Sequence, residues 1–501
     1  MRFGAKPRFD FICTFCIVPI YEMVFCTVRK SRAVIYALVI EKGNDQMMNL
    51  ESLSEIMMSA ERIHFVGIGG ISMSSLAAIT KERGYRVSGS DRNETLLTDR
   101  LSASGIRVVY HHSEENVKGA SLVVYTAAVH SDNPEIEGAK KLGIPLCSRA
   151  DYLGWLMSGY TERIGIAGTH GKSTVTSMIS EIFISEGLNP TVVSGAELKD
   201  MGGAYRIGNK SFFIFEACEY CDSFLSFVPT AAVITNIEYD HADYFKDMKQ
   251  LRRSFAQYIN YAERAIICSD DPESAALIDE LHNEKLITFG IENQAEYTAS
   301  DITFHNGCAE FYVMKNGEKL CGIKLSVSGK HNILNALAAA ATAFSYGLSP
   351  EGVSKGLERF QGAARRFEYM GTAANGALVY NDYAHHPSEI RATLGAAKAF
   401  GKRIVTVFQP HTYSRTAGLW DGFVTAFADS DLTVFADIYA ARETNTYGVN
   451  SEQLAGAVKG GIYLSSFEKI SDYIKNNCNE NDIVLILGAG DIIRVGNMIL
   501  K

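Results

Sequence analysis

The sequence predicts an α/β protein of three domains, in which parallel strands alternate with helices. Three observations support this prediction. The 501 residues are enough for about three domains, short apolar runs alternate with helical segments, and glycine turns follow two of the apolar runs, at 67–70 and 168–171. We expect an N-terminal Rossmann-like domain at 61–159, a central P-loop ATPase-like domain at 160–362 and a C-terminal Rossmann-like domain at 363–501.

Composition and charge exclude several classes of protein. Apolar residues make up 47% of the chain and charged residues 21%, which is typical of globular proteins and excludes a disordered chain. The formal charge of −9 leaves no basic excess for a phosphate backbone, so no nucleic-acid partner is expected. Ten cysteines are too few for a disulfide scaffold and indicate a reducing cytosol. Cys13 with Cys16, and Cys218 with Cys221, are isolated pairs, whereas zinc normally takes four ligands.

Residues 1–60 differ in sequence pattern from the rest of the chain, and we expect them to form an extension that is not part of the fold. The apolar run from Phe11 to Tyr21 is shorter than the roughly 20 residues that a membrane helix needs, so stable membrane insertion is not expected. No small-residue cleavage site follows it, as a signal peptide requires. The preferred interpretation is an upstream mistranslation. Four methionines stand shortly before the first strand: Met47, Met48, Met57 and Met58.

The first domain begins with the strand, turn and helix order of a nucleotide-binding fold. A strand is predicted at 62–66 and a helix at 74–83, separated by the glycine turn. Two further strands, at 85–88 and 122–125, are short and apolar, as buried parallel strands are. The glycine and polar residues of 155–162 indicate a linker to the next domain.

The turn Gly67-Ile68-Gly69-Gly70 predicts a diphosphate site. Its backbone amides can approach a diphosphate at a helix N-terminus. Asp91, roughly 20 residues further on, is placed to accept hydrogen bonds from a ribose. Ser72 replaces the third glycine of the dinucleotide fingerprint, so a nicotinamide cofactor is the less favoured interpretation, and close helix packing is a second alternative.

The sharpest motif follows a strand at 163–167 and precedes a helix that ends near residue 186. It reads Gly168-Thr169-His170-Gly171-Lys172-Ser173-Thr174. In such a loop the amides and the helix N-terminus bind phosphates, the lysine places a charge on the β and γ oxygens, and the serine hydroxyl reaches magnesium. Ile166 stands where the strict P-loop has its first glycine, yet a purely structural turn would leave Lys172 unexplained. The motif therefore predicts an ATP site.

Two later strands end in groups suited to a magnesium site. A strand at 212–215 ends at Glu216, and a strand at 231–235 is followed by His241. Because the carboxyl ends of parallel strands meet at one edge of a sheet, these side chains are expected near the P-loop magnesium or a second ion. Histidine is an unusual ligand for so hard a cation, and a surface or capping histidine is the alternative.

The C-terminal domain is predicted to follow a helical stretch at 332–346. Its strands are expected at 378–380, 404–408 and 483–487, and helices lie between them. Gln361 and Gly362 close the central domain, so the boundary falls near residue 363.

Six motifs in this order resemble those of the Mur ligases. They are Gly168-Thr-His-Gly-Lys-Ser173, Thr235-Asn-Ile-Glu-Tyr-Asp-His241, Lys330-His-Asn-Ile-Leu-Asn335, Arg365-Arg-Phe367, Asn381-Asp-Tyr-Ala-His-His-Pro387 and Phe408-Gln-Pro-His-Thr-Tyr-Ser-Arg-Thr416. The resemblance runs from about Ile63 to the C-terminus.

The resemblance implies a cytoplasmic, ADP-forming ligase of peptidoglycan synthesis that uses ATP and Mg2+. In this family ATP phosphorylates the lactyl carboxylate of the sugar nucleotide UDP-N-acetylmuramate, and an amine then attacks the acyl phosphate. The segment 408–416 favours L-alanine as the amine. A sibling ligase that attaches a recycled tripeptide is the closest alternative. A nicotinamide oxidoreductase and a non-catalytic regulatory relative are alternatives of other classes.

The resemblance also implies a role for each matching residue. The residues implied to be catalytic are Lys172, His241, Arg366 and Asp382. ATP is bound by Gly168, Thr169, His170, Gly171, Lys172, Ser173, Thr174, Asn332, Asn335, Arg366 and Asp382. The metal ligands are Ser173, Glu216 and His241. The sugar nucleotide is bound by Gly67, Gly69, Gly70 and Asp91, and the amine by Tyr383, His385, His411, Tyr413 and Arg415.

Within the amine pocket, Arg415 suits a carboxylate because its guanidinium can bond both oxygens. His385 or His411 is expected either to take a proton from the ammonium or to be structural. Some residues depart from the family pattern. They are Ser72 for a glycine, Cys218 and Cys221 for acidic residues, Asn381 for an aspartate, and Thr412 where some relatives carry an arginine.

Overall fold

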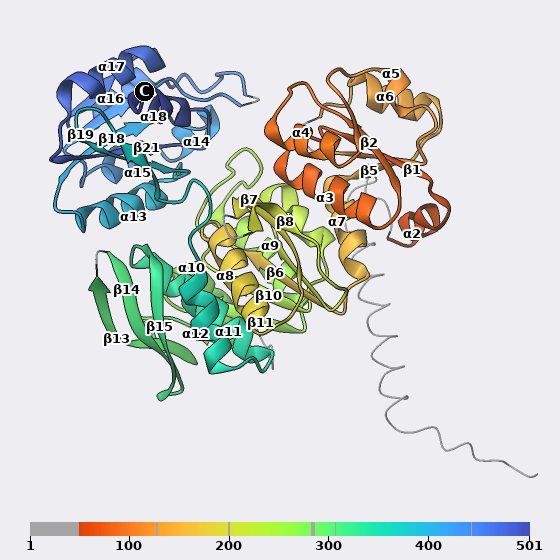
Figure 1. Ribbon diagram of the computed structural model, residues 1–501, viewed down its shortest axis with the longest axis horizontal. Coiled ribbons are helices and arrows are strands. Elements are labelled where there is room, and N and C mark those ends of the chain that lie inside the picture. Colours follow the sequence, from red (N-terminus) through yellow and green to blue (C-terminus); the bar gives the residue numbers. More distant parts are fainter. Residues whose placement is uncertain (1–49, 127–128, 199–200, 282–285, 306, 442) are drawn as a thin grey trace, which may run out of the picture. The chain divides into compact units, whose positions relative to one another are not determined.

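The computed structural model of the chain describes residues 50–126, 129–198, 201–281, 286–305, 307–441 and 443–501. Three sheets flanked by helices make up this part of the chain, which is α/β throughout, as predicted (Figure 1). The predictions for the apolar run, for Cys13 and Cys16, and for Met47 and Met48 lie outside the described residues.

The N-terminal sheet has five parallel strands in the order β3-β2-β1-β4-β5. Its elements are β1 (Arg62–Val66), α3 (Ile71–Glu82), β2 (Arg86–Ser90), α4 (Leu96–Ala103), β3 (Arg107–Val109), α5 (Glu114–Val117), β4 (Leu122–Tyr125), α6 (Pro134–Lys141), β5 (Leu146–Ser148) and α7 (Arg149–Ser158). The connection from β3 returns across β1 to β4, so the strand order reverses beside β1. That reversal puts the glycine turn after β1 at the switch point, where this kind of sheet binds ligands.

Two expectations about the edges of this domain are wrong. Residues 50–59, expected to lie outside the fold, form helix α2 (Leu50–Ser59), which packs on α7. Leu53 and Met57 are one helical turn apart and fully buried in the core, so their spacing gives the helix an apolar face. The expected linker at 155–162 begins inside α7, because Leu156 and Met157 are core residues and the helix continues to Ser158.

The central sheet has ten strands in the order β15-β14-β13-β12-β11-β10-β6-β9-β7-β8. Its first part comprises β6 (Glu162–Ala167), α8 (Lys172–Ser185), β7 (Thr191–Leu198), β8 (Gly203–Arg206), β9 (Phe212–Glu216), the short 3-10 segment η2 (Tyr220–Ser226), β10 (Ala231–Ile234) and α9 (Met248–Asn260). Its second part comprises β11 (Arg264–Cys268), α10 (Pro272–Glu280), β12 (Leu286–Phe289), β13 (Tyr297–His305), β14 (Cys308–Lys315), β15 (Glu318–Ser328), α11 (His331–Ser345) and α12 (Pro350–Arg359).

Strand β6 lies between β9 and β10 in this sheet, all three parallel. Their carboxyl ends therefore meet at one edge, which brings Glu216, the phosphate loop after β6 and the segment after β10 together, as the sequence predicts. Helices α8, α11 and α12 pack on one another and carry an alanine-rich core. The antiparallel strands β13, β14 and β15 extend the sheet at the other side.

The C-terminal sheet has the order β16-β17-β21-β18-β19-β20, parallel except for β16. Its elements are β16 (Glu368–Thr372), β17 (Leu378–Asp382), α13 (Pro387–Lys398), β18 (Arg403–Phe408), α14 (Tyr413–Gly418), α15 (Trp420–Ala426), β19 (Leu432–Phe435), α16 (Ser451–Ala457), β20 (Gly461–Tyr463), α17 (Phe467–Asn477), β21 (Asp482–Leu487) and α18 (Ile493–Ile499).

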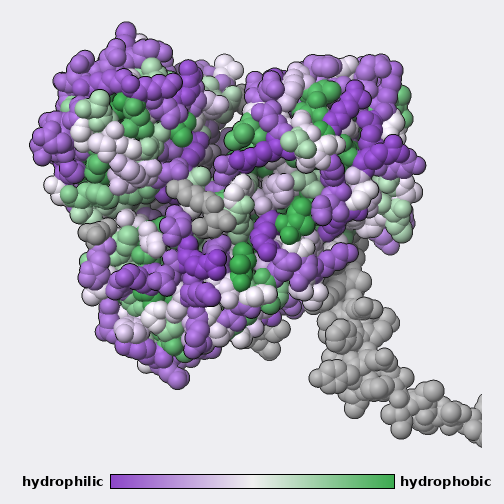
Figure 2. Space-filling view, viewed as in Figure 1, coloured by the Kyte–Doolittle hydropathy of each residue, from purple (hydrophilic) through white to green (hydrophobic). Residues whose placement is uncertain are grey.

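Hydrophilic residues cover most of the face shown in Figure 2, and apolar residues appear there only in small groups. The large apolar side chains are instead buried on the two faces of each sheet. Among the described residues, none of the helices has the length and apolar character to cross a membrane.

Candidate active site

The phosphate loop between β6 and α8 is built so that two positions require glycine. Gly168 has a φ of +139°, and a Cβ on it would lie 2.1 Å from the Thr235 hydroxyl oxygen. Gly171 has a φ of +83°, and a Cβ on it would lie 2.7 Å from the Asn335 amide oxygen. Both the turn geometry and the close approach of neighbouring side chains therefore exclude larger residues.

The segment that follows β10 holds this loop in place. Asn236 accepts hydrogen bonds from the backbone amides of Thr169 (3.1 Å, to its carbonyl) and His170 (2.9 Å, to its side chain). The Thr235 hydroxyl donates to the His170 carbonyl at 2.6 Å. Two amides of the loop are thus used within the protein. The donors left for an anion are the first amides of α8, which begins at Lys172 without a side-chain cap.

The Lys172 ammonium is held over this helix start by a carboxylate that the sequence analysis did not select. Its Nζ donates to the carbonyls of Gly168 and Thr169, and lies 3.3 Å from an oxygen of Glu219. Burial opposes the charge on Lys172, but the Glu219 carboxylate outweighs burial and raises the lysine pKa. The other Glu219 oxygen lies 3.7 Å from His241 Nε2. Glu219 therefore lies between Lys172 and His241.

The predicted metal ligands lie around the same loop. Ser173 is in the first turn of α8 and is 8% exposed. Glu216, at the end of β9, accepts hydrogen bonds from the Ser194 hydroxyl and the Gly195 amide, at 2.7 and 2.6 Å. His241 faces Glu219 and has its ring 4.6 Å from that of Tyr220, rather than contacting Glu216. The metal role of these side chains remains a prediction.

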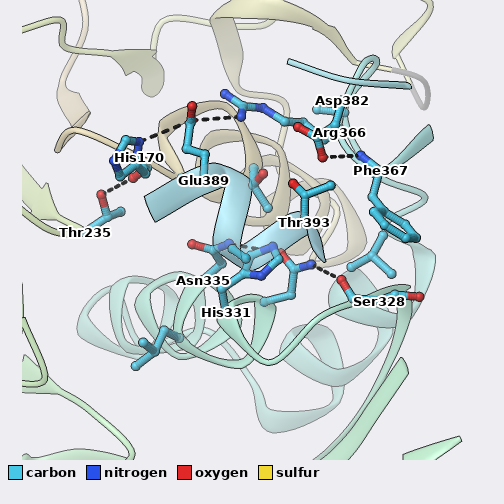
Figure 3. Close-up of a pocket in the computed structure, with 18 of the residues that line it drawn as sticks. His170, Thr235, Ser328, His331, Asn335, Arg366, Phe367, Asp382, Glu389 and Thr393 are labelled. Carbon is cyan, nitrogen blue, oxygen red and sulfur yellow. Dashed lines mark hydrogen bonds and ion pairs between the residues drawn. The ribbon is translucent and has the colours of Figure 1, made fainter. Parts of the chain in front are cut away.

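A cavity of about 580 Å³ opens beside the phosphate loop (Figure 3). This volume is within the range of small-molecule sites. Of the predicted ATP-binding residues, His170, Gly171, Thr174, Asn332, Asn335, Arg366 and Asp382 line it. The residues come from the central sheet, from α11 and from the C-terminal domain, so the cavity lies where the predicted nucleotide-binding parts meet.

Helix α11 contributes two asparagines to the cavity. Asn332 donates to the Ser328 carbonyl at 2.7 Å, and Asn335 donates to the Asn332 side-chain oxygen at 3.0 Å. The Asn335 oxygen is the atom that lies close to Gly171. The structure therefore places Asn335 against the phosphate loop. The predicted function of both residues at the adenine remains a prediction.

Glu389, on α13, is the centre of an ion-pair network that the sequence analysis missed. One of its oxygens lies 3.1 Å from Arg366 Nη1 and 3.2 Å from His170 Nδ1, and Figure 3 shows it between the two. Burial raises the pKa of Glu389 by itself, but the imidazole and guanidinium groups around it lower that pKa well below its usual value. Burial likewise lowers the pKa of His170, yet Glu389 and Glu238 raise it to about 9. His170 is therefore a cation at neutral pH.

Asp382, at the end of β17, orients the loop that carries Arg366. Its two oxygens accept hydrogen bonds from the Phe367 and Ala384 amides, each at 2.8 Å. Burial raises the pKa of Asp382, and Arg366 counteracts this effect. The carboxylate is thus engaged with backbone on the C-terminal side of the cavity.

In the predicted amine pocket, Arg415 is already paired. Its Nε and Nη2 atoms donate to the two oxygens of Asp240 at 2.8 and 3.0 Å, and both side chains are 9% exposed. Asp240 follows β10 in the central domain, so this fork joins two domains. The guanidinium expected to bind a substrate carboxylate is used within the protein in this arrangement.

The two candidate bases of this pocket are neutral. Burial lowers the pKa of His385 to about 3 and that of His411 to about 4. His411 Nδ1 lies 3.0 Å from Arg415 Nη1, and the His411 ring stacks on Tyr439. A group with so low a pKa is a weak general base at neutral pH, so this arrangement favours the structural alternative. Tyr413 begins α14, and the ring of Tyr383 lies 5.3 Å from that of His385.

The glycine turn of the N-terminal domain is closed by the residue predicted to hold the ribose. Asp91 accepts a hydrogen bond from the Gly69 amide at 2.8 Å, and a Cβ on Gly69 would collide with the same oxygen. Gly67 has a φ of +79°, and its amide donates to the Ser90 carbonyl. Ser72, which departs from the glycine fingerprint, accepts a hydrogen bond from Arg149 at 3.1 Å.

Models of the Mur ligases match most of the chain. The Mur ligase family catalytic domain matches residues 62–161, the Mur ligase middle domain matches 166–343, and the Mur ligase glutamate ligase domain matches 365–490.

Curated relatives match over nearly their whole length. The UDP-N-acetylmuramate–L-alanine ligase of Acetivibrio thermocellus is 47% identical over 451 residues, which cover 88% of this chain and 96% of that protein. The ligase of the same name from Agathobacter rectalis is 45% identical over 448 residues, 88% of this chain and 97% of that one. The crystal structure of the Thermotoga maritima UDP-N-acetylmuramate–alanine ligase has a TM-score of 0.75 and 30% identity, covering 87% of this chain and 97% of that one.

Proposed function

The chain belongs to the Mur ligase family, and from this premise we propose that it is the ADP-forming ligase that joins L-alanine to the lactyl carboxylate of UDP-N-acetylmuramate. The observation that carries this conclusion is the match to the two curated L-alanine ligases, at 45 to 47% identity over nearly their full length. The enzyme is thus an amide-bond ligase of peptidoglycan precursor synthesis, and its substrates are small molecules.

The tripeptide-adding sibling is less well supported. A solved murein peptide ligase from Psychrobacter arcticus is 22% identical, which supports a common fold alone. In the same comparison of solved structures, the Thermotoga maritima UDP-N-acetylmuramate–alanine ligase is 30% identical to this chain. The segment 408–416 favours the same choice.

The chemistry of the reaction explains the charges at the phosphate loop. Transfer of a phosphoryl group to a carboxylate brings two anions together, so the site must neutralise charge and position the reactants. We propose that Lys172 and the first amides of α8 bind the β- and γ-phosphates, and that Arg366 approaches them from the C-terminal domain. The acyl phosphate formed would hydrolyse in water, which is a reason to build the site from several domains that exclude solvent.

The oxygen donors at the phosphate loop fit Mg2+. The Ser173 hydroxyl and the Glu216 carboxylate are hard ligands of the kind Mg2+ prefers, and Glu219 adds a third such group, whereas the His241 nitrogen suits it less well. We propose that Ser173, Glu216 and His241 hold the ion. Bound there, Mg2+ would offset the negative charge of the phosphates.

The other site residues and the domain limits are part of the same proposal. Gly67, Gly69, Gly70 and Asp91 would bind the sugar nucleotide, with boundaries near residues 160 and 363. We propose that the enzyme acts in the cytoplasm, since ATP and UDP-sugars are its substrates. The cysteines of the described residues form no disulfide bonds, in keeping with a reducing compartment.

Release of phosphate from ATP tests this proposal. The purified chain, with UDP-N-acetylmuramate, is offered L-alanine, L-serine, glycine or the L-Ala-D-Glu-diaminopimelate tripeptide in separate reactions. We expect L-alanine to give the fastest release. Release with the tripeptide alone would assign the chain to the sibling activity, and no release with any amine would contradict the ligase.

A further inference from the structure

Three side chains beside the phosphate loop form a group of which the proposed function uses only His170, as an ATP-binding residue. His170 belongs to the loop, Glu238 follows β10, and His386 precedes α13 in the C-terminal domain. One ligand atom from each lies within 4.8 Å of the others, and no other group of three His, Cys, Asp or Glu in the described chain does so. His386 is 5% exposed. The His170 side chain is 16% exposed and that of Glu238 36%, so the group lies at the edge of the cavity and solvent reaches it from the Glu238 side.

The outer nitrogen of each histidine faces an oxygen atom. His170 Nδ1 lies 3.2 Å from the Glu389 carboxylate, and His386 Nε2 lies 3.4 Å from the Tyr239 carbonyl. Histidines that bind metals have this arrangement, because an acceptor at the outer nitrogen keeps its proton there while the inner nitrogen coordinates. Because His170 is a cation at neutral pH, a metal ion that binds its inner nitrogen must displace the proton on that atom, so binding should strengthen as pH rises. The inner atoms are then His170 Nε2 and His386 Nδ1, and both point toward Glu238.

Two of the three spacings between the inner atoms are close to those of a tetrahedral site. A Glu238 oxygen lies 3.7 Å from His170 Nε2 and 3.5 Å from His386 Nδ1. Bonds of about 2.0–2.1 Å to a tetrahedral ion put its ligands roughly 3.3–3.4 Å apart. Shifts of a few tenths of an ångström would bring these two distances to that value, and the two histidine nitrogens lie no more than 4.8 Å apart. The Ser388 hydroxyl, 2.9 Å from His170 Nε2 and 2.7 Å from His386 Nδ1, occupies the fourth side.

We propose that His170, Glu238 and His386 form a binding site for a transition-metal ion such as Zn2+, separate from the magnesium ligands. Two imidazoles and one carboxylate are a ligand set that suits zinc, whereas Mg2+ selects oxygen donors. The site joins the phosphate loop to the start of α13, so a bound ion links the central and C-terminal domains.

The position of the site gives it a consequence for the proposed ligase. A metal ion on His170 Nε2 fixes the phosphate loop to α13 at the edge of the nucleotide cavity, which His170 and Ser388 both line. We therefore expect Zn2+ to inhibit ATP turnover even with Mg2+ in excess. This consequence rests on the proposed function, but binding of the ion does not.

Zinc binding is measured first, on the purified full chain without substrates. Competition with a chromophoric chelator gives the Kd and the stoichiometry, and X-ray absorption gives the ligand shell. We expect one Zn2+ per chain with nitrogen and oxygen ligands at about 2.0–2.1 Å. Glu238→Gln and His386→Asn should each raise the Kd at least 10-fold. Asparagine is a good N-cap residue, so His386→Asn preserves the start of α13.

His305→Asn is the matched control, because His305 is an exposed histidine at the end of β13. It should leave the Kd unchanged. A sulfur shell near 2.3 Å would place the ion on cysteines and overturn the proposal. An unchanged Kd in both Glu238→Gln and His386→Asn would overturn it as well.

Phosphate release then tests inhibition. Zinc should inhibit the unmodified chain at concentrations near its Kd, and Glu238→Gln should need correspondingly more. If the chain binds zinc through these residues but releases no phosphate with any amine, the ligase proposal fails and the metal site stands. If phosphate release is normal and no zinc binds, the metal site fails alone.

Discussion

Replacing Asp240 by asparagine should destabilise the protein strongly. Asp240 and Arg415 are both 9% exposed, and two parallel hydrogen bonds of 2.8 and 3.0 Å join them. At about 3 Å and an effective dielectric constant near 20, two unit charges attract each other by roughly 5–6 kcal/mol. Asp240→Asn removes this attraction and leaves the guanidinium buried without its counter-charge. Losses of about 3–5 kcal/mol are typical of such a change.

The surface of the same molecule supplies a control with similar geometry. Glu61 and Arg86 form an ion pair of 3.0 Å, but both side chains are 77% exposed. Glu61→Gln should cost less than about 1 kcal/mol, because water already solvates both charges. The two variants thus compare a buried ion pair with two hydrogen bonds and an exposed one with a single hydrogen bond, at similar N···O distances.

Unfolding by urea, followed by fluorescence and circular dichroism, measures both changes. A double variant, Asp240→Asn with Arg415→Met, should recover part of the loss, since it removes the unpaired charge as well. The reasoning is refuted if Asp240→Asn is no more destabilising than Glu61→Gln. It is also refuted if Arg415→Met changes only the KM for L-alanine and leaves stability intact, since Arg415 would then serve the substrate alone.

Further predictions concern catalysis, the first helix and acid stability. Lys172→Ala should lower phosphate release at least 100-fold, about 3 kcal/mol of transition-state stabilisation, and near-normal turnover would contradict its role. Leu53→Ala should cost about 2–5 kcal/mol in urea unfolding, whereas Met58→Ala, at a position 82% exposed, should be near neutral. Burial by itself raises the pKa of Glu135, but hydrogen bonds, first from His64, lower it to about 2. This group stabilises the fold above its unfolded pKa, near 4.5, and that contribution is lost as pH falls toward 2. Glu135→Gln should therefore flatten the acid limb of a plot of unfolding midpoint against pH.

Local pattern was sufficient to predict the buried strands. Strands β1 and β4 begin and end where predicted. β1 is a β-rich run that ends at Gly67, and β4 is an apolar run between two polar residues. The antiparallel strands β13 to β15 were not predicted. Most side chains along β13 are at least partly exposed, so its sequence lacks the apolar run that marked the others. Helix α2 was missed because it was grouped with the preceding segment of different composition, although its own spacing indicates an amphipathic helix.

The candidate site likewise contains residues that the local sequence predicts and residues that it does not. Gly168, Gly171 and Lys172 could be predicted because consecutive residues form the phosphate loop. Glu389 could not, since nothing near it in sequence shows that it meets His170, which precedes it by more than 200 residues. The contact between Asp240 and Arg415 was missed for the same reason. The sequence analysis assigned Arg415 to the amine pocket and gave Asp240 no role. Contacts between domains depend on the tertiary structure, which spacing along the chain does not reveal.

The missed residues Glu219 and Glu389 are both carboxylates. The cationic residues that the sequence predicted explain why carboxylates lie there. A site for phosphates concentrates cations, here Lys172, His170 and Arg366, and buried cations repel one another unless counter-charges lie among them. Glu219 neutralises Lys172, and Glu389 lies between His170 and Arg366. A triphosphate would supply the same counter-charge, so its oxygens and these carboxylates compete for the same donors. Carboxylates beside a predicted phosphate loop are therefore expected on electrostatic grounds, even where no motif identifies them.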